Sequence, residues 1–153
     1  MSQTTLDVAM TNCYIAMSTA SSTTGFFNMS GYANSIKPGP RTRSTGKAFT
    51  YDGDTGIIHG GKRQPLDLEL DFLYTEEATG PYKLIQTQYE VAGGGSLWLR
   101  WCPKNSTTGD YIFTIPSGVI KSLDLPSGDP DSGESVKIKL VMEVPYIVQG
   151  TSA

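Results

Sequence analysis

Two stretches of the chain alternate between apolar and charged residues. In residues 66–72, Leu or Phe occupies every second position and an acidic residue occupies each position between. Residues 136–144 alternate in the same way, with Val141 as the one apolar residue in the charged series. Successive side chains of a β-strand point to opposite faces, so each stretch predicts a strand with one apolar and one charged face. Such a strand lies between a core and either water or a polar interface.

Shorter apolar segments also predict strands, and turn-forming residues separate them. These segments are residues 12–17, 26–36, 97–102, 110–115 and 119–125. Pro and Gly residues at 37–40 and 116–118 interrupt regular structure, and residues 125–133 form a polar loop.

A single helix is predicted, over residues 81–92. Pro81 suits the first helical turn, and the glycines at 93–95 end the helix. Leu84, Ile85 and Tyr89 lie near helical spacing and supply an apolar stripe. Several strands, one helix and several more strands predict a mostly β fold: an antiparallel β-sandwich or partly closed barrel with one flanking α-helix. We expect one domain over residues 1–153, with residues 1–11 as an N-terminal arm.

Residues 41–63 form the least core-like part of the chain, within a long loop expected over residues 37–64. Asp-Gly between short β-prone runs is typical of a hairpin, so Asp52-Gly53-Asp54 predicts a long projecting loop or hairpin. The segment is rich in basic residues, and its acidic residues are confined to the Asp-Gly-Asp turn. The charged residues are Lys37, Arg41, Arg43, Lys47, Asp52, Asp54, Lys62 and Arg63.

Length, charge and cysteine content limit the possible functions. A chain of 153 residues suits one domain, and its net charge of −3 argues against tight nucleic-acid binding, which needs a basic excess. No apolar run is long enough to span a bilayer, and the N-terminus lacks the features of a signal peptide. We therefore expect the chain to fold in a cytoplasm, with Cys13 and Cys102 as free thiols, although a buried pair stays open.

No catalytic or metal-binding pattern emerges. His59 is the one histidine and has no second histidine with which to share a metal, so it is interpreted as a solvated loop residue. His59 could in principle activate a cysteine as a nucleophile, but the better interpretation of the cysteine is a small, buried and unreactive residue. Residues 52–54 and 129–131 lack the full ligand series of a calcium loop, and turn chemistry explains them. We expect no cofactor, no metal and no enzyme activity.

The order of these features resembles the tail tube (major tail) proteins of long-tailed phages. The resemblance is one of pattern and order, and it covers about residues 13–150. It runs through residues 31–36, the long loop, 66–74, the turn at 75–79, the helix start at 81–85, 93–101, the turn at 105–110, Phe113, 118–120 and 136–144.

The resemblance implies a subunit that forms hexameric rings, which stack into a hollow tube. Inner strands of neighbouring subunits would join into one barrel around a lumen that passes DNA without binding it specifically. The loop at 37–64 would reach the adjacent ring. The implied partners are copies of the same chain, a tape-measure protein and a tail terminator, and the implied location is the virion tail after assembly in the host cytoplasm. Contractile-tail inner tubes and the type VI secretion tube look similar.

Two hypotheses about residues follow. The polar faces of residues 66–72 and 136–144 would line the lumen, because a strongly basic wall would hold DNA back. The candidates are Asp67, Glu69, Asp71, Lys137, Lys139 and Glu143. If the two strands are antiparallel neighbours, the lysines can pair with the acidic residues. The basic residues of the loop would dock on acidic groups of a neighbouring ring, for which Glu76, Glu77, Asp129 and Asp131 are candidates.

A binding module is the main alternative function. A phage decoration protein or an adhesin-like β-sandwich would have the same fold class, because a sandwich supports many functions. Self-association into rings or tubes distinguishes the tube subunit from this alternative. An enzyme ranks third, since one histidine and scattered carboxylates do not form a convergent polar site.

Overall fold

The computed structural model describes residues 7–20 and 24–152, so residues 1–6 of the expected N-terminal arm lie outside the described part. Among the described residues, β-strands are the main regular structure, with one α-helix and one turn of 3-10 helix. The elements are η1 (Met10–Asn12), β1 (Tyr14–Ser18), β2 (Phe27–Asn28), β3 (Ala33–Pro38), β4 (Arg43–Ala48), β5 (Ile57–Arg63), β6 (Leu66–Leu73), α1 (Pro81–Tyr89), β7 (Ser96–Cys102), β8 (Tyr111–Leu123), β9 (Lys137–Val144) and β10 (Val148–Thr151).

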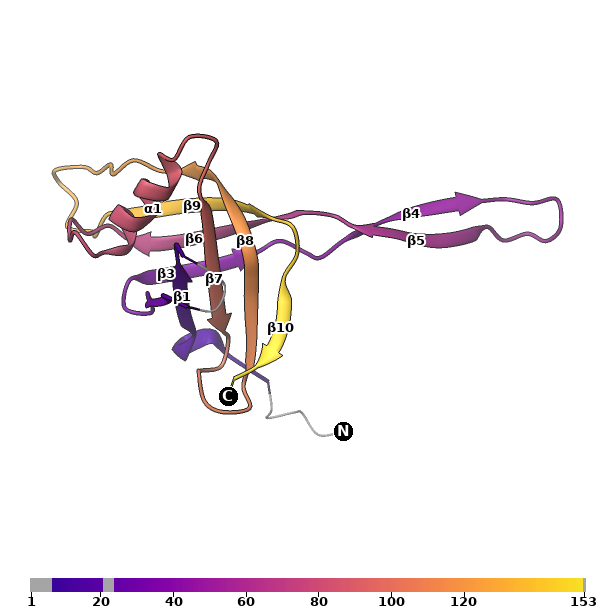
Figure 1. Cartoon of the computed structure of the whole chain (residues 1–153), viewed down its shortest axis with the longest axis horizontal. Helices are drawn as coiled ribbons and strands as arrows, with labels where there is room; N and C mark the ends of the chain where they lie inside the picture. The colour runs from indigo at the N-terminus through magenta and orange to yellow at the C-terminus, as the bar shows by residue number, and fades with distance from the viewer. Residues whose placement is uncertain (1–6, 21–23, 153) are drawn as a thin grey trace.

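Eight of these strands form one antiparallel sheet that folds over on itself. The strand order is β2-β1-β7-β8-β9-β6-β3, and β10 also pairs with β8. In Figure 1, β3, β6 and β9 run along the long axis of the molecule, while β1, β7, β8 and β10 run across it. The sheet ends on β2 and β3, so it does not close. The expected class, an antiparallel sandwich or partly closed barrel with one flanking helix, is confirmed.

Strand β8 joins the strands that run along the long axis to those that run across it. The sequence prediction for this strand was wrong. Residues 110–115 and 119–125 were expected as two strands, but they form one 13-residue strand. A bulge between the pairs Leu99↔Ile115 and Leu97↔Gly118 accommodates Pro116, because a proline at a bulge removes no ladder hydrogen bond. Gly118 is buried against β9, where an added Cβ would lie 2.9 Å from a methyl of Val144.

The apolar faces of β6 and β9 form the centre of the core. The two strands are antiparallel neighbours over their whole length, from Leu66↔Val144 to Leu73↔Lys137. Their alternation therefore places every second side chain inside, as the pattern predicts. The fully buried side chains of this pair are Leu68, Leu70, Phe72, Ile138, Leu140, Met142 and Val144.

Helix α1 begins at Pro81 as expected but ends at Tyr89 rather than at residue 92. The chain turns early because the Gly95 N–H donates to the Gln88 carbonyl oxygen (3.0 Å) and the Gln88 side-chain amide donates to the Ser96 carbonyl oxygen (2.6 Å). These bonds direct the chain into β7. Ile85 is buried, whereas Tyr89, expected on the apolar stripe, is 49% exposed.

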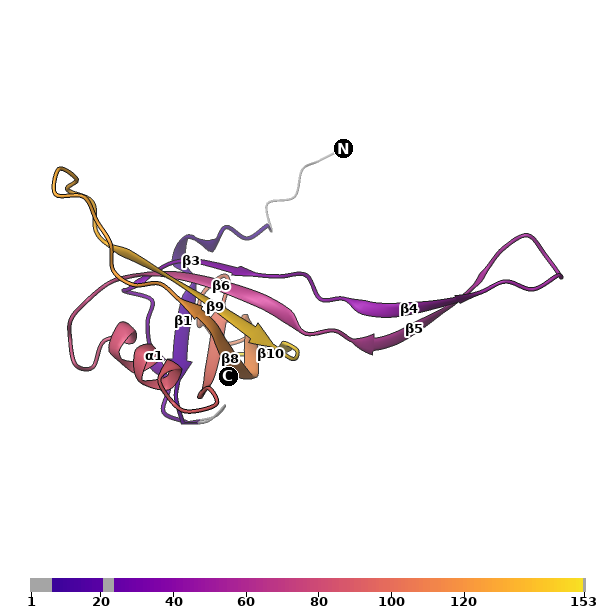
Figure 2. The same cartoon turned by 90° about the horizontal axis from the view of Figure 1, so that it is seen from above.

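The segment at 37–64 is a hairpin that continues the β3–β6 pair away from the sheet. Beyond Pro38, the Gly39 N–H donates to the Asp67 carbonyl oxygen (2.8 Å) and the Gln64 N–H to that of Thr42 (2.9 Å). Strands β4 and β5 then pair only with each other. Figures 1 and 2 show the result: a two-stranded ribbon that projects far from the rest of the molecule. The predicted projecting hairpin is confirmed.

Two further local predictions need correction. Residues 26–36 are not one extended stretch, because the N–H groups of Tyr32 and Ala33 both donate to the Met29 carbonyl oxygen and make a turn between β2 and β3. Strand β10 was not anticipated, since its sequence Val-Gln-Gly-Thr carries no alternating pattern and all four residues are exposed.

The burial pattern makes a stability prediction. Phe72→Ala removes a fully buried ring and should lower the free energy of unfolding by about 3–5 kcal/mol. Tyr51→Ala, at the exposed hairpin tip, should change it by less than about 0.5 kcal/mol. Urea unfolding of the dilute chain, followed by tryptophan fluorescence, measures both. Equal losses from the two variants would contradict this assignment of the core.

Candidate assembly interface

The charged face of the long-axis strands brings together residues from β3, β6, β8 and β9. Glu143 lies opposite Asp67, and Lys139 lies opposite Asp71, so these predicted residues share one face. The Lys139 Nζ is 3.9 Å from a Glu69 carboxylate oxygen, which makes the cross-strand ion pair that the sequence suggested. Lys137 lies opposite Leu73 instead of a carboxylate.

Two lysines of this face were not among the predicted lumen residues. Lys37 of β3 lies opposite Glu69, and Lys121 of β8 reaches across β9 to Asp67, with Nζ and carboxylate oxygen 3.2 Å apart. The contact of Lys121 depends on the bulge between Ile120 and Ser122, which no sequence pattern marks. The position of Lys37 next to an extended segment was visible in the sequence. Its place on the charged face was not, because that depends on which strand pairs with β3.

The charged face is electrically balanced. It carries the carboxylates of Asp67, Glu69, Asp71 and Glu143 and the ammonium groups of Lys37, Lys121, Lys137 and Lys139. Both ion pairs are about half exposed, so each contributes only about 0–1 kcal/mol to stability. Their more important consequence is that the face presents no uncompensated row of positive charge.

Two edges of this charged layer have no partner strand within the described residues. Strand β3 pairs only with β6. Strand β8 pairs with β7 up to Val119, and from Ile120 to Leu123 it pairs only with β9. Exposed edges leave main-chain N–H and C=O groups open to pairing with another chain. The order β8-β9-β6-β3 alternates in direction, so its two outer strands run antiparallel to each other.

The hairpin exposes large apolar side chains. Phe49 is 77% exposed, Tyr51 is fully exposed, and Ile58 is 66% exposed. An isolated two-stranded hairpin is marginally stable in water, and exposed apolar groups of this size mark interaction surfaces. His59 and Lys47 lie on the same ribbon, and all side chains of β4 are exposed. Within the hairpin, Gly61 passes so close to the Ser44 carbonyl oxygen that an added Cβ would lie 2.8 Å from it.

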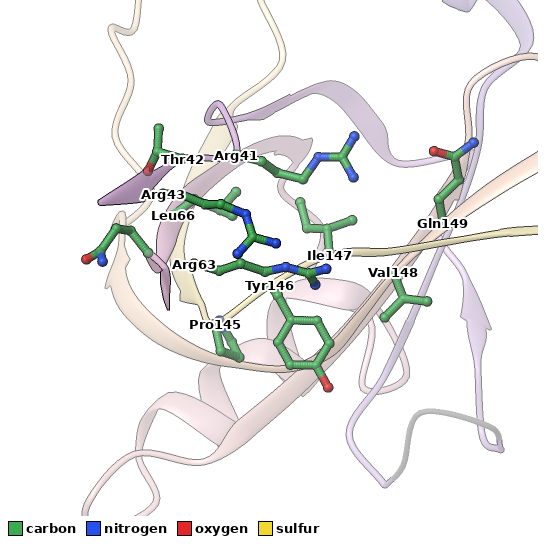
Figure 3. A pocket seen from close by; sticks show the side chains of 11 residues that line it. Arg41, Thr42, Arg43, Arg63, Leu66, Pro145, Tyr146, Ile147, Val148 and Gln149 are labelled. Carbon is green, nitrogen blue, oxygen red and sulfur yellow. The ribbon is translucent and has the colours of Figure 1, made fainter. Parts of the chain in front are cut away.

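An arginine-lined cleft lies where the hairpin leaves the sheet (Figure 3). It has a volume of about 660 Å³ and is bounded on one side by the hairpin base and on the other by the connection from β9 to β10. Arg43 and Arg63 lie opposite each other on the hairpin strands, and Figure 3 shows their guanidinium groups close together near Tyr146 and Ile147, with that of Arg41 on the other side of Ile147. We call Arg41, Arg43 and Arg63 the arginine cleft residues. The predicted loop residues are thus divided between this cleft and the ribbon beyond it.

Acidic loops occupy the opposite end of the molecule. The segment from β8 to β9 and the segment from β6 to α1 both lie at the end away from the hairpin in Figures 1 and 2. Both are exposed, and Lys137 at the start of β9 is the lysine adjoining the first of them. Their carboxylates are Glu76, Glu77, Asp124, Asp129, Asp131 and Glu134.

The residues considered for catalysis do not come together in one site. His59 is exposed on the hairpin, opposite Gly46. Cys13 and Cys102 lie near each other beside β1 and β7 but are free thiols. Burial, with a smaller contribution from Cys102, raises the pKa of the Cys13 thiol to about 11, which disfavours a nucleophilic thiolate. Across residues 7–20 and 24–152, no three His, Cys, Asp or Glu side chains are grouped as a metal site.

None of the described helices is both long and apolar enough to cross a membrane.

By sequence, the chain matches no family model and no curated protein. By structure, it is similar to three kinds of tube assembly. A chain of the sheath–tube complex of an extracellular contractile injection system (PVC, extended state) aligns with TM-score 0.73 and 11% identity over 98% of this chain and 99% of that one. The SPP1 tail tube gives TM-score 0.64 and 11% identity over 95% and 80% of the two chains. The tail of an empty GTA particle, refined with C6 symmetry, gives 0.60 and 12% over 99% and 100%.

These neighbours define the class of fold. The chain has the fold of phage-type tail tube proteins, as the sequence pattern led us to expect. The neighbours are components of tubes and not enzymes, in line with the absence of a catalytic pattern in the sequence. At identities this low the likeness concerns the fold, so the roles of individual side chains must be argued from this chain alone.

The raised pKa of Cys13 makes a prediction about thiol reactivity. With a pKa of about 11, only about one thiol in a thousand is ionised at pH 8. Cys13 should therefore react with a disulfide reagent on the order of a hundredfold more slowly in the folded chain than in urea, and its rate should rise as pH approaches 11. Stopped-flow kinetics on Cys102→Ser isolate this thiol. Fast reaction at pH 8 in the folded variant would reopen the possibility of a reactive cysteine.

Proposed function

We propose that this chain is the repeating subunit of a phage-type tail tube, in which hexameric rings stack into a conduit for DNA. The observation that carries the proposal is the pair of open edges on the charged layer, in a chain with the tail tube fold. An edge that is neither covered nor charged enough to repel other chains needs a partner.

Ring formation follows from the direction of the edge strands. Because β3 and the end of β8 run antiparallel within one subunit, a copy rotated about a common axis brings its β8 beside β3 with antiparallel polarity. Each subunit then contributes β8, β9, β6 and β3 to one continuous barrel, whose hydrogen bonds satisfy both open edges. The refinement of the similar GTA tail with C6 symmetry supports six subunits per ring.

The charged face would form the wall of the lumen. Its apolar side is committed to the core, so the face with four carboxylates and four lysines is the one left to point inward. A wall without net charge neither grips phosphates nor presents a strong barrier to them, which suits the passage of DNA. Asp67, Glu69, Asp71, Lys137, Lys139 and Glu143 keep the role that their pattern suggested.

The hairpin would join one ring to the next. It projects along the long axis with exposed apolar residues and a basic base, and acidic loops lie at the other end. Contacts between two different ends of identical subunits generate an open stack instead of a closed pair. We further propose that a tape-measure protein and a tail terminator bind the assembled tube. The tube would assemble in the host cytoplasm and then form part of the virion tail.

Electron microscopy of the purified chain tests the proposal. The full chain should form rings or tubes at high concentration, because both the edges and the two ends are complementary. Deleting residues 42–60 should leave the fold intact, as judged by thermal unfolding and circular dichroism, but abolish tubes, since the ribbon is lost. Solitary monomers or trimers of the full chain would reject the tube and favour a decoration or adhesin-like module.

A reconstruction of the tube tests the lumen separately. We expect Glu69 and Lys139 to face the channel, and β3 to pair with β8 of the adjacent subunit. Replacing Glu69, Asp71 and Glu143 by Gln should preserve tubes, because their side chains are exposed or only partly buried and lie off the core. The same change should slow DNA transit in a particle, because four lysines then face a single carboxylate, that of Asp67. A channel lined by unpaired Lys and Arg in the unmodified tube would refute the proposed lumen face.

A further inference from the structure

The arginine cleft at the hairpin base carries charge that the chain itself does not neutralise. Among residues 7–20 and 24–152, the salt bridges are those of Lys121 with Asp67 and Lys139 with Glu69, and neither involves the cleft. Within the described part of the chain, the one polar contact of the cleft guanidinium groups is a bond from Arg43 Nη1 to the Gly61 carbonyl oxygen at 3.2 Å. The described residues that line the cleft include no Asp or Glu.

Such an arrangement is unfavourable unless an anion fills it. Arg43 and Arg63 lie directly opposite each other on the hairpin, where like charges are destabilising. The third guanidinium, that of Arg41, points over the same space in Figure 3. Guanidinium groups bind carboxylates with two parallel hydrogen bonds, so converging arginines form a site for a chain segment that carries several carboxylates.

The wall of the cleft narrows the choice of ligand. Leu66 and Ile147 are buried at its base, while Tyr146 and Val148 are 42% and 47% exposed. A matching ligand combines carboxylates with an apolar side chain. A volume of about 660 Å³ lies in the usual range for sites that enclose a short segment or a small molecule.

The loop from β8 to β9 has this combination. It carries Asp129, Asp131 and Glu134, and Leu125 near its start is 78% exposed. A turn fixes its acidic part, because the Asp131 N–H donates to the Asp129 carboxylate (3.1 Å) and the Ser132 N–H to the Asp129 carbonyl oxygen (3.0 Å). The loop lies at the far end of the molecule from the cleft, so it cannot fill the cleft of its own subunit.

We propose that the arginine cleft binds the acidic loop, residues 124–135, of a second copy of this chain in the neighbouring ring. This inference rests on the proposed tube function and deepens it by naming both sides of the contact between rings. Arg41, Arg43 and Arg63 bind the carboxylates of Asp129, Asp131 and Glu134, and Leu125 packs on the apolar wall beside Tyr146. The hairpin beyond the cleft extends along the same neighbour.

A charge exchange between two variants tests the proposal. Variant one carries Arg43→Glu and Arg63→Glu, so its cleft and loop are both acidic. Variant two carries Asp129→Arg, Asp131→Arg and Glu134→Arg, so its loop is basic like its cleft. Neither matches itself, and each should form tubes at least about tenfold less than the unchanged chain at low salt. Mixed in equal amounts they match each other, and tubes should return, measured by sedimentation and negative-stain microscopy.

A control variant, Lys83→Glu with Lys104→Glu, changes the net charge as much as variant one at exposed sites outside the cleft. It should assemble like the unchanged chain, and thermal unfolding should show that all three variants are folded.

Normal tubes from variants one and two alone would overturn the proposal, and so would a mixture that stays unassembled. If variant one also loses DNA binding that the unchanged chain shows, the cleft serves nucleic acid instead. Absence of tubes from the unchanged chain would reject the tube function itself.

Discussion

The open edges of the charged layer are the constraint on which the rest of the structure depends. The charged layer ends on β3 and on the last residues of β8, and both leave main-chain donors and acceptors without partners within the described residues. The chain neither shortens these edges nor covers them with another described strand. Because the two edges belong to strands of opposite direction, one rotation would satisfy both in the proposed ring, where the β3 edge of each subunit would meet the β8 edge of the next.

The ribbon couples this lateral contact to the axial one. Strand β3 carries the open edge, and the β3–β6 pair leads into the hairpin through short connections that are held by the bonds at Gly39 and Gln64. Fixing β3 beside a neighbour therefore also fixes the direction in which the hairpin points. A subunit in a ring would present its arginine cleft and its apolar tip in a set orientation, which lowers the entropy cost of adding the next ring.

The distribution of charge differs between the surfaces of the molecule: one face is balanced, and the two ends carry opposite charges. The face proposed to meet DNA pairs its lysines with carboxylates, as in the contacts of Lys121 with Asp67 and Lys139 with Glu69. The two ends keep their charges apart, basic at the hairpin base and acidic in the far loops. Unlike charges held at opposite ends of one rigid body favour a head-to-tail partner over a symmetric one.

The sequence by itself determined two kinds of element: strands with a regular alternation of apolar and charged residues, and elements whose ends are marked by Pro or Gly. Alternation in residues 66–72 and 136–144 specified both strands and their buried faces, since a period of two fits only a strand with one side in the core. Pro81 placed the start of the helix, whereas the glycines at 93–95 predicted its end three residues too late, and Asp52-Gly53 predicted the hairpin. Only the tertiary structure decided that 111–123 is one strand, that Lys121 reaches Asp67, and that the three arginines of the hairpin base line one cleft with residues 145–149. These features depend on a bulge, on strand register and on a chain crossing between layers, which arise from contacts between residues distant in sequence and leave no local pattern.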